Sequence, residues 1–496
     1  MTAVCVMVLG TTSGAGKSWL TTALCRHYAQ RGLKVAPFKA QNMSNNARVV
    51  AGVAGVANAH GHTQPGEIGS AQYFQALAAR AVPEVRMNPV LLKPEADTRS
   101  QVVLMGEVNR ELGDTPWRKR SEKVWPYITA ALDALCAEND VVVIEGAGSP
   151  AEINLHASDI VNMRVARHVQ ARCLLVTDID RGGAFAHLYG TWALLPAHEQ
   201  ALIKGFVLNK FRGDASLLAP APEMLQQLTG IPVVATLPMW WQHGLPEEDG
   251  VFDDSARASG VVHTTVAVVA YPRLSNLDEF QPLKNVPGIR LVWARSPADC
   301  AGADWIVLPG SKATAADLQW LRAQGLDHTV AAHAAKGGAV LGICGGLQML
   351  GEALIDPHGI DGNAPGLGLL PLVTVFDPLK TVTRTQATFS DVTGPWQALS
   401  GLVAAGYEIH HGQTAQHPAM ALAGDVAREV MPGLGWQNAA GNVLGCYLHG
   451  LFEDAAVLQA LFGAQTRTLD HVFDGLARFL ETHTEPGVLD SLIQKD

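Results

Sequence analysis

Cys344 lies in the segment AVLGICGGLQML, where an apolar, β-rich run ends and a helix pattern begins at once. Gly342, Cys344 and Gly346 have the spacing G-x-C-x-G, the nucleophile-elbow pattern with cysteine in place of serine. A helix that begins beside the cysteine favours the thiolate, which is the nucleophilic form. The backbone N–H of Gly345 can then stabilise an oxyanion. The segment therefore predicts a nucleophilic cysteine rather than a small core residue.

A second oxyanion donor and a histidine base must come from other segments. The motif LPGSK offers the backbone of Gly310 or Ser311 as the donor. A catalytic thiolate also needs a histidine that is close in space but not in sequence. His449, at the end of a strand pattern in VLGCYLHGLFE, is one candidate, and His410 and His411 in YEIHHG are the others. Spacing alone leaves these alternatives open.

A phosphate-binding loop is predicted near the beginning of the chain. The segment GTTSGAGKS lies between a strand pattern and an apolar helix pattern, which is the context that a P-loop needs. Lys17 is expected to reach the β- and γ-phosphates of ATP, and Ser18 to hold Mg²⁺. Thr11 stands where the common form of the motif has glycine, one residue after Gly10. The expected ATP-binding residues are Gly10, Thr12, Gly14, Gly16, Lys17, Ser18 and Asn209.

Acidic and amide side chains at other strand ends complete the predicted nucleotide site. Glu145 ends the strand pattern VVVIEGAG and is the expected acidic partner of Mg²⁺. Glu67, in GEIGSAQ, is the candidate for a second metal contact. Asn209, in FVLNKFRGD, can read the adenine edge through its amide, although a turn-forming asparagine is the alternative. The predicted metal ligands are Ser18, Glu67 and Glu145, and the predicted cofactors are ATP and Mg²⁺.

Strand and helix patterns alternate along the chain, which predicts an α/β fold of two doubly wound domains with mainly parallel sheets. The expected strands are Val4–Leu9, Val141–Ile144, Cys173–Thr177, Gly205–Leu208, Thr265–Ala270, Trp305–Leu308, Ala339–Ile343 and Val443–Leu448. The expected helices are Trp19–Arg31, Ala71–Ala81 and Trp125–Glu138. The polar stretch LPEEDGVFDDSARASG predicts a linker. The expected domains are 1–240 for ATP and substrate and 263–496 for the cysteine site, joined by the linker 241–262.

Composition limits the classes of function. The chain has 496 residues, of which 48% are hydrophobic and 17% are charged, and its net charge is −10. The scattered basic residues argue against a nucleic-acid partner. Seven irregularly spaced cysteines without a C-x-x-C pair argue for a reducing, cytoplasmic location. The apolar N-terminus is expected to be a buried strand rather than a signal peptide, and no membrane span is expected.

Several motifs resemble known families. LPGS, GICGGLQ and a late histidine occur in this order in class I glutamine amidotransferase domains, with a flavodoxin-like fold. This resemblance implies that Cys344 is the nucleophile and His449 the base. Many class I members have glutamate two residues after the histidine, where this chain has Leu451. Glu408 or Glu453 would then orient His449, and the sequence does not choose between them.

The whole chain resembles the cobyric acid synthase family, and its P-loop domain resembles the dethiobiotin synthetase group. The matching stretches are PFKAQNMSNN, GEIGSAQ, NPVLLKP, EGAGSPAEINL, DIDRGGAFA, LPGSK, GICGGLQ, GYEIHHG and LHGLF. The alternative is cobyrinic acid a,c-diamide synthase, which has a different motif in place of SPAEINL. A partitioning or septum-site ATPase, or a non-enzymatic carrier, agrees less well with a chain that has both sites.

The resemblance implies amidation of the b, d, e and g carboxylates of adenosylcobyrinic acid a,c-diamide, with ATP as the activating substrate and glutamine as the nitrogen donor. Asp159, Asp178, Asp180 and Arg181 are expected to line the substrate side of the first domain. Turn-closing carboxylates are the alternative for these residues. The expected partners are therefore small molecules, and a homo-oligomer is compatible with the sequence.

Overall fold

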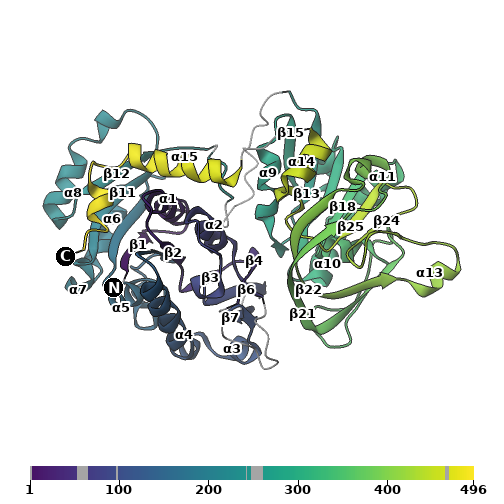
Figure 1. Cartoon of the computed structure of the whole chain (residues 1–496), viewed down its shortest axis with the longest axis horizontal. Coiled ribbons are helices and arrows are strands. Elements are labelled where there is room, and N and C mark those ends of the chain that lie inside the picture. The colour runs from purple at the N-terminus through teal and green to yellow at the C-terminus, as the bar shows by residue number, and fades with distance from the viewer. Residues whose placement is uncertain are drawn as a thin grey trace.

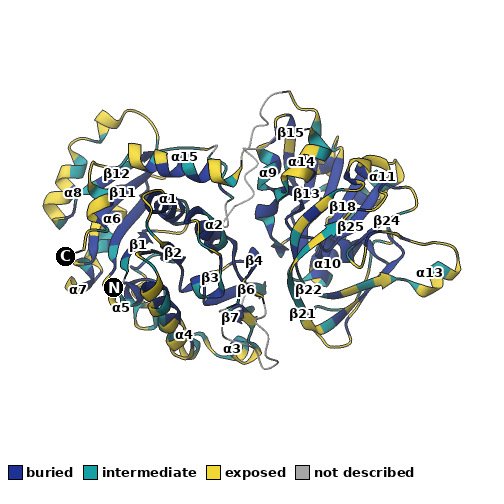
Figure 2. Cartoon of the chain, viewed as in Figure 1, coloured by how far each residue is buried: buried dark blue, intermediate teal, exposed yellow. Residues whose placement is uncertain are grey.

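The chain folds into two α/β lobes (Figure 1). The computed structural model describes residues 3–52, 65–96, 99–241, 243–246, 261–463 and 468–495. Most of the expected linker, 241–262, therefore lies outside the described residues. In each lobe the sheet strands are buried and the outer faces of the helices are exposed (Figure 2).

The first lobe is built on a six-stranded sheet in the order β12-β11-β10-β1-β9-β2. All its pairings are parallel. Its strands are β1 (Val4–Gly10), β2 (Val35–Phe38), β9 (Val141–Glu145), β10 (Arg172–Asp178), β11 (Ile203–Phe211) and β12 (Val233–Pro238). Apolar runs such as VCVMVLG in β1 form these strands because helices cover both faces of the sheet. The predicted parallel sheet is confirmed.

Helices surround this sheet. In the described chain, none of the helices is both long and apolar enough to cross a lipid bilayer. The main ones are α1 (Lys17–Gln30), α2 (Ser70–Ala78), α4 (Trp117–Glu138), α5 (Met163–His168), α6 (Ala184–Ala193) and α8 (Ala221–Thr229). The three predicted helices are present. One start is wrong, because α4 begins at Trp117 rather than at Trp125. Pro126 favours a first helical turn, but here it lies inside the helix.

Smaller strands lie beside the first sheet. They are β3 (Gln41–Met43), β4 (Ala47–Val50), β5 (Gly66–Gly69), β6 (Val90–Ala96) and β7 (Arg99–Leu104). In Figure 1, β4 lies at the side of the first lobe that faces the second lobe.

The second lobe has a seven-stranded sheet in the order β15-β13-β16-β18-β25-β24-β23. The strands are β13 (Thr264–Val269), β15 (Ile289–Ala294), β16 (Trp305–Leu308), β18 (Ala339–Ile343), β23 (Arg428–Met431), β24 (Gly435–Gln437) and β25 (Val443–Cys446). The pairings from β15 to β25 are parallel. β24 pairs with β25 in an antiparallel way, and β23 pairs with β24 in the same way. The four strands predicted in this half are all present.

Other elements of the second lobe contribute to its site. They include β14 (Leu274–Ser275), η4 (Leu277–Phe280), β17 (Gly310–Ser311), α10 (Thr314–Ala323), α11 (Leu326–Ala335), α12 (Gly345–Leu350) and α14 (Ala455–Phe462). A long antiparallel hairpin, β21 (Leu372–Thr388) and β22 (Val403–Gln416), belongs to a second sheet.

The C-terminal helices return to the first lobe. In Figure 1, α15 (Leu469–Thr482), drawn in yellow, lies beside α1. Its buried residues Val472 and Leu476 share a hydrophobic core with α1 and the first sheet. Arg26 of α1 pairs with Asp474 at 2.7 Å, and Phe479 stacks on Trp240 at 4.8 Å between ring centroids. We therefore propose that α15 and α16 (Val488–Ser491) be counted with the first lobe, although the sequence predicts one continuous domain over 263–496.

Candidate active sites

The cysteine site is built on a sharp turn between β18 and α12. Cys344 connects these elements with φ 52° and ψ −106°, a backbone conformation that non-glycine residues rarely adopt. The turn requires glycine on both sides. A Cβ on Gly346 would overlap the carbonyl oxygen of Leu308, and one on Gly342 would lie 2.7 Å from the backbone of Gly346. The local sequence therefore presents Cys344 at the N-terminus of a helix.

His449 completes this site from the segment that follows β25. Its imidazole interacts electrostatically with Cys344, and its Nδ1 lies 3.2 Å from Oε1 of Glu279. The other oxygen of Glu279 accepts the backbone N–H of Gly450 at 2.9 Å. His449 and Glu279 are both buried. Cys344, His449 and Glu279 therefore have the arrangement of a catalytic triad, in which the carboxylate orients the imidazole.

The electrostatic environment favours the protonated imidazole. Burial opposes the charge, but the Glu279 carboxylate and Cys344 raise the pKa of His449 to about 10. The ring of Tyr407 stacks on that of His449, with 5.3 Å between centroids and 18° between planes. At neutral pH the His449 imidazole is therefore protonated, and its charge lies between the side chains of Cys344 and Glu279.

The sequence did not indicate Glu279, and the two carboxylates that it offered are engaged elsewhere. Glu408 lies 3.1 Å from Nε2 of His410 and accepts the hydroxyl of Thr385. Glu453 pairs with Arg48 at 2.5 Å. Glu279 follows the short strand β14, in a segment with no motif around it that predicts a catalytic role.

The predicted oxyanion residues lie beside the triad. Gly310 pairs with Ser275, and a Cβ on Gly310 would lie 2.8 Å from Cε1 of His449. A Cβ on Gly345 would lie 2.7 Å from the backbone nitrogen of Ser311. The absence of side chains therefore allows two backbone segments to approach each other around the nucleophile. That Gly310, Ser311 and Gly345 donate their N–H groups to an oxyanion stays a prediction.

The nucleotide site lies where β1 enters α1. Gly14 and Gly16 have φ values of 72° and 102°, which glycine adopts without strain. The Lys17 ammonium donates to the carbonyl oxygens of Thr12 at 3.0 Å and Gly148 at 3.1 Å. The structure thus forms the loop that the sequence predicts, with its lysine folded over it. Gly10 ends β1, and a Cβ there would meet Lys17 Nζ at 2.9 Å.

Glu145, at the end of β9, contacts the residues of the loop directly. The Ser18 hydroxyl donates to Glu145 Oε1 at 2.8 Å, and Lys39 Nζ lies 2.9 Å from the same oxygen. Gln75 donates to the other oxygen at 2.5 Å. Burial would raise the pKa of Glu145, but Lys39 and these hydrogen bonds lower it. The carboxylate is therefore held ionised.

A hydroxyl and a carboxylate in contact are the donors that Mg²⁺ takes in P-loop sites, where phosphates and water complete its shell. No group of three or more acidic, histidine or cysteine side chains suited to a metal occurs in the described parts of the chain. Ser18 and Glu145 therefore fit a magnesium ion that arrives with a nucleotide. Glu67 makes different contacts, since its oxygens pair with Lys93 at 2.6 Å and Lys380 at 2.5 Å.

Asn209 is hydrogen-bonded to the phosphate loop. Its Nδ2 donates to the carbonyl of Ala15 at 2.9 Å, and its Oδ1 accepts the backbone N–H of Lys210. A Cβ on Gly16 would overlap the Asn209 amide, so the close approach explains this glycine. That Asn209 also reads adenine stays a prediction.

Of the predicted substrate-side residues, Asp178 and Arg181 lie near the loop. Asp178 pairs with Lys210 at 3.2 Å and Arg181 at 3.5 Å, and Lys210 also donates to Gly14 of the loop. Asp180 accepts from Arg212 at 2.7 Å. These residues lie at or just after the carboxyl ends of β10 and β11, which meet at one sheet edge.

Asp159 has a local structural role. It accepts the backbone N–H groups of Val161 and Asn162 at 2.9 Å each, before α5 begins. It also lines a cavity of about 270 Å³ with Arg164 and Glu199. Its part in substrate binding stays a prediction.

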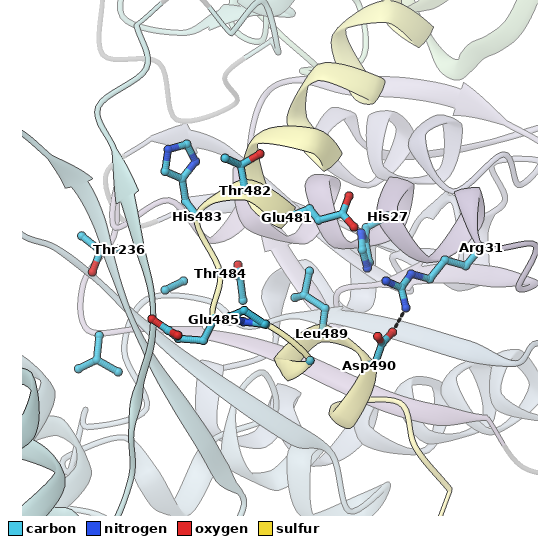
Figure 3. A pocket seen from close by; sticks show the side chains of 14 residues that line it. His27, Arg31, Thr236, Glu481, Thr482, His483, Thr484, Glu485, Leu489 and Asp490 are labelled. Carbon is cyan, nitrogen blue, oxygen red and sulfur yellow. Dashed lines mark ion pairs between the residues drawn. The ribbon is translucent and has the colours of Figure 1, made fainter.

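A larger polar pocket, of about 670 Å³, lies at the C-terminal end of α1, opposite the phosphate loop. Figure 3 shows the ion pair between Arg31 and Asp490 in its lining, with His27 and Glu481 on the neighbouring helices. None of the residues predicted from the sequence lines this pocket.

Comparisons with known families match both lobes. Residues 6–247 match the CobQ/CobB/MinD/ParA nucleotide binding domain, and residues 265–457 match the CobB/CobQ-like glutamine amidotransferase domain. With the fold and the two sites, these matches define an enzyme of the glutamine amidotransferase class that has a nucleotide-binding domain in the same chain. We call residues 3–241 the nucleotide-binding domain and residues 261–463 the amidotransferase domain.

Relatives along the whole chain define the family. Cobyric acid synthase of Acidovorax ebreus (strain TPSY) is 78% identical over 493 residues, which cover 99% of both chains. Cobyric acid synthase of Polaromonas naphthalenivorans (strain CJ2) is 75% identical and covers 99% of this chain and 100% of that one. The chain belongs to the cobyric acid synthase family. A solved structure of PurLQS from Thermotoga maritima covers 40% of this chain and 98% of that one at 17% identity, with a TM-score of 0.31, which is too low to support an argument.

Proposed function

We propose that this chain forms adenosylcobyric acid by amidating the b, d, e and g carboxylates of adenosylcobyrinic acid a,c-diamide, with ATP and glutamine as co-substrates. The observation that carries the proposal is the 78% identity to a cobyric acid synthase across both domains. The alternative, cobyrinic acid a,c-diamide synthase, is not favoured, because relatives named cobyric acid synthase match the chain from end to end. We place the reaction in the cytoplasm, where ATP and glutamine are available.

In the amidotransferase domain, the Cys344 thiolate attacks the side-chain amide carbon of glutamine. The carbon–nitrogen bond breaks, and the His449 imidazolium gives its proton to the leaving nitrogen, so ammonia departs and a thioester remains. The neutral imidazole then takes a proton from water as the water attacks the thioester. Glutamate leaves and the thiolate–imidazolium pair is restored. Glu279 holds the ring in position throughout and stabilises its positive charge.

In the nucleotide-binding domain, a corrinoid carboxylate attacks the γ-phosphorus of ATP. ADP leaves, and the acyl phosphate then has a leaving group that the carboxylate lacks. Ammonia attacks its carbonyl carbon and releases phosphate, which gives the amide. Lys17 and the backbone of the loop stabilise the negative charge on the phosphates. Magnesium, bound with the nucleotide at Ser18 and Glu145, would neutralise phosphate charge during the transfer.

The two half-reactions share only ammonia, most of which is protonated in water at neutral pH. A protected route between the domains would keep it nucleophilic. The interface between the domains contains the buried Lys93 and the largely covered Lys380, and loss of hydration lowers the pKa of Lys380 to about 7. We propose that ammonia crosses this interface without entering bulk water.

Mass spectrometry of the corrinoid tests the proposal. The protein is incubated with ATP, Mg²⁺, glutamine and adenosylcobyrinic acid a,c-diamide. Four successive mass changes are expected, each equal to the replacement of a hydroxyl by an amino group, with glutamate and ADP formed in proportion. No change with this substrate, together with changes in cobyrinic acid, would assign the chain to the a,c-diamide reaction instead.

A further inference from the structure

A buried arginine joins the two domains beside the glutaminase triad. Arg48 belongs to β4 of the nucleotide-binding domain and is only 1% exposed. Its Nη2 lies 2.5 Å from Asp278 and 2.5 Å from Glu453, and its Nη1 donates to the Tyr407 hydroxyl at 2.5 Å. All three partners belong to the amidotransferase domain. A buried guanidinium with three charged or polar partners is a strong, orientation-dependent contact.

Two of these partners directly adjoin catalytic residues. Asp278 precedes Glu279, the carboxylate that orients His449. Tyr407 stacks on the His449 ring, and the backbones of the two residues exchange hydrogen bonds at 2.9 and 3.2 Å. One guanidinium therefore fixes both the segment that carries the carboxylate and the ring that covers the imidazole.

Two asparagines hold the same segments together by a reciprocal exchange. The backbone N–H of Ala47 donates to Asn276 Oδ1 at 2.9 Å, and the backbone N–H of Leu277 donates to Asn46 Oδ1 at 2.9 Å. Asn276 itself is in the left-handed region, with φ 55°, just before Asp278. Because this backbone conformation is uncommon, the contacts from the other domain help to maintain it.

Charge gives a further reason for an arginine at this position. Three carboxylates lie together here: Asp278 and Glu279 are buried, and Glu453 is half-buried. Burial raises the pKa of Glu453 to about 7, and Arg48 opposes that rise. Without the guanidinium, two of the carboxylates would have no cationic partner among these contacts and would move or take up protons.

The same arginine is connected to the nucleotide site through α2. Its guanidinium is 5.3 Å from the ring centroid of Phe74 on α2. The next residue of α2, Gln75, donates to Glu145, the carboxylate that meets Ser18 of the phosphate loop. Arg48 therefore packs against a helix that also contacts the predicted ATP site.

We propose that Arg48 is a positioning residue for glutamine hydrolysis: it holds the Glu279 segment and Tyr407 against His449, so that the nucleotide-binding domain completes the glutaminase site. This inference rests on the proposed function, because it needs the triad to hydrolyse glutamine. Arg48 touches no reacting atom and acts through Glu279 and Tyr407.

Steady-state glutamine hydrolysis by the full chain tests the inference, with ammonia-supported amidation as the second readout. R48Q is expected to lower kcat for glutamine on the order of 10–100-fold, because small misplacements of catalytic groups have effects of this size. The KM for glutamine should change much less, and amidation with added ammonia should continue. R48K should recover only part of kcat, because an ammonium cannot bridge the three partners as a planar guanidinium does.

Arg384 offers a matched control. It also crosses the domain interface, where its Nε donates to the Val49 carbonyl at 3.1 Å, but it has no described contact with a triad residue. R384Q should therefore keep kcat near that of the unaltered chain. An equal loss in R48Q and R384Q, or an unchanged kcat in R48Q, would overturn the inference.

If R48Q does not fold, a second variant tests the positioning role of Arg48. Y407F keeps the ring on His449 and removes only the hydroxyl that Arg48 donates to. It should lower kcat in the same direction by a smaller factor, with ammonia-supported amidation intact, and an unaltered kcat would contradict the role of Arg48. If the unaltered chain itself fails to hydrolyse glutamine, the proposed function fails first.

Discussion

The imidazole of His449 and the carboxylate of Glu279 are hydrogen-bonded over 3.2 Å, although 170 positions separate them in the chain. Glu279 lies in η4, after the short strand β14, and His449 follows β25. The fold of the second lobe brings these segments together beside Cys344. We therefore propose Glu279 as the carboxylate partner of His449.

Substitution of Glu279 tests that assignment. E279Q should lower kcat for glutamine hydrolysis by about 10²–10⁴-fold, because an amide no longer stabilises the imidazolium or fixes its tautomer. E408Q is the control, since Glu408 bonds to His410 and Thr385. Steady-state assays of glutamate release compare the two variants. A larger loss in E408Q than in E279Q would contradict the triad described above.

The pH dependence of glutamine hydrolysis should follow the raised pKa of His449. Burial opposes protonation, yet Glu279 and Cys344 raise that pKa from 6.5 to about 10. The imidazolium that protonates the leaving ammonia should therefore persist until the pH approaches 10. In E279Q the alkaline limb of kcat should move to lower pH, because the main charge that favours the imidazolium is gone. If the alkaline limb of kcat stays at the same pH in E279Q, a group other than His449 determines it.

The same shift affects stability. A histidine whose pKa is raised on folding stabilises the fold fully below pH 6.5, and this contribution is lost as the pH rises towards 10. Denaturant unfolding of C344A and E279Q measures this contribution across the same pH range. Between pH 6.5 and 10, the free energy of unfolding should fall less in E279Q than in C344A, because Glu279 is the larger cause of the raised pKa.

Sequence analysis predicted the parts of the site that depend on local geometry. Cys344 and the phosphate loop were predicted because an elbow and a P-loop need glycines at fixed spacing from the functional residue. The sequence could not reveal Glu279, because its contact with His449 exists only after the sheet has formed. The same limit explains why Arg48 received no role and why the contacts of Glu67 with Lys93 and Lys380 were not foreseen.

The two chemistries should separate cleanly by mutation. C344A should abolish amidation with glutamine, while ammonium salts at alkaline pH restore it, because the nucleotide site does not need the thiol. K17A should have the opposite effect: glutamine hydrolysis persists and amidation from either nitrogen source is lost. The measurements are glutamate release and corrinoid mass for each variant. Failure of ammonia to rescue a folded C344A protein would argue against a separate synthetase site.

Gly346, two residues after the nucleophile, should be intolerant of any side chain. G346A should destabilise the chain by about 1–3 kcal/mol through overpacking, because its Cβ would overlap the Leu308 carbonyl. Gly190 in α6 is the matched control, since nothing lies within 4 Å of a Cβ there. G190A should be neutral or stabilise the helix by about 0.5–1 kcal/mol. Denaturant unfolding measures both, and equal effects would refute the steric explanation.

The most direct test of the central claim follows the nitrogen atom from one domain to the other. The chain is given ATP, Mg²⁺, adenosylcobyrinic acid a,c-diamide and glutamine whose side-chain amide contains a heavy nitrogen isotope, in a buffer with unlabelled ammonium. We expect the heavy isotope in all the new amides of the corrinoid, with little dilution by the unlabelled ammonium. Glutamate formation without labelled amides in the corrinoid would contradict the account.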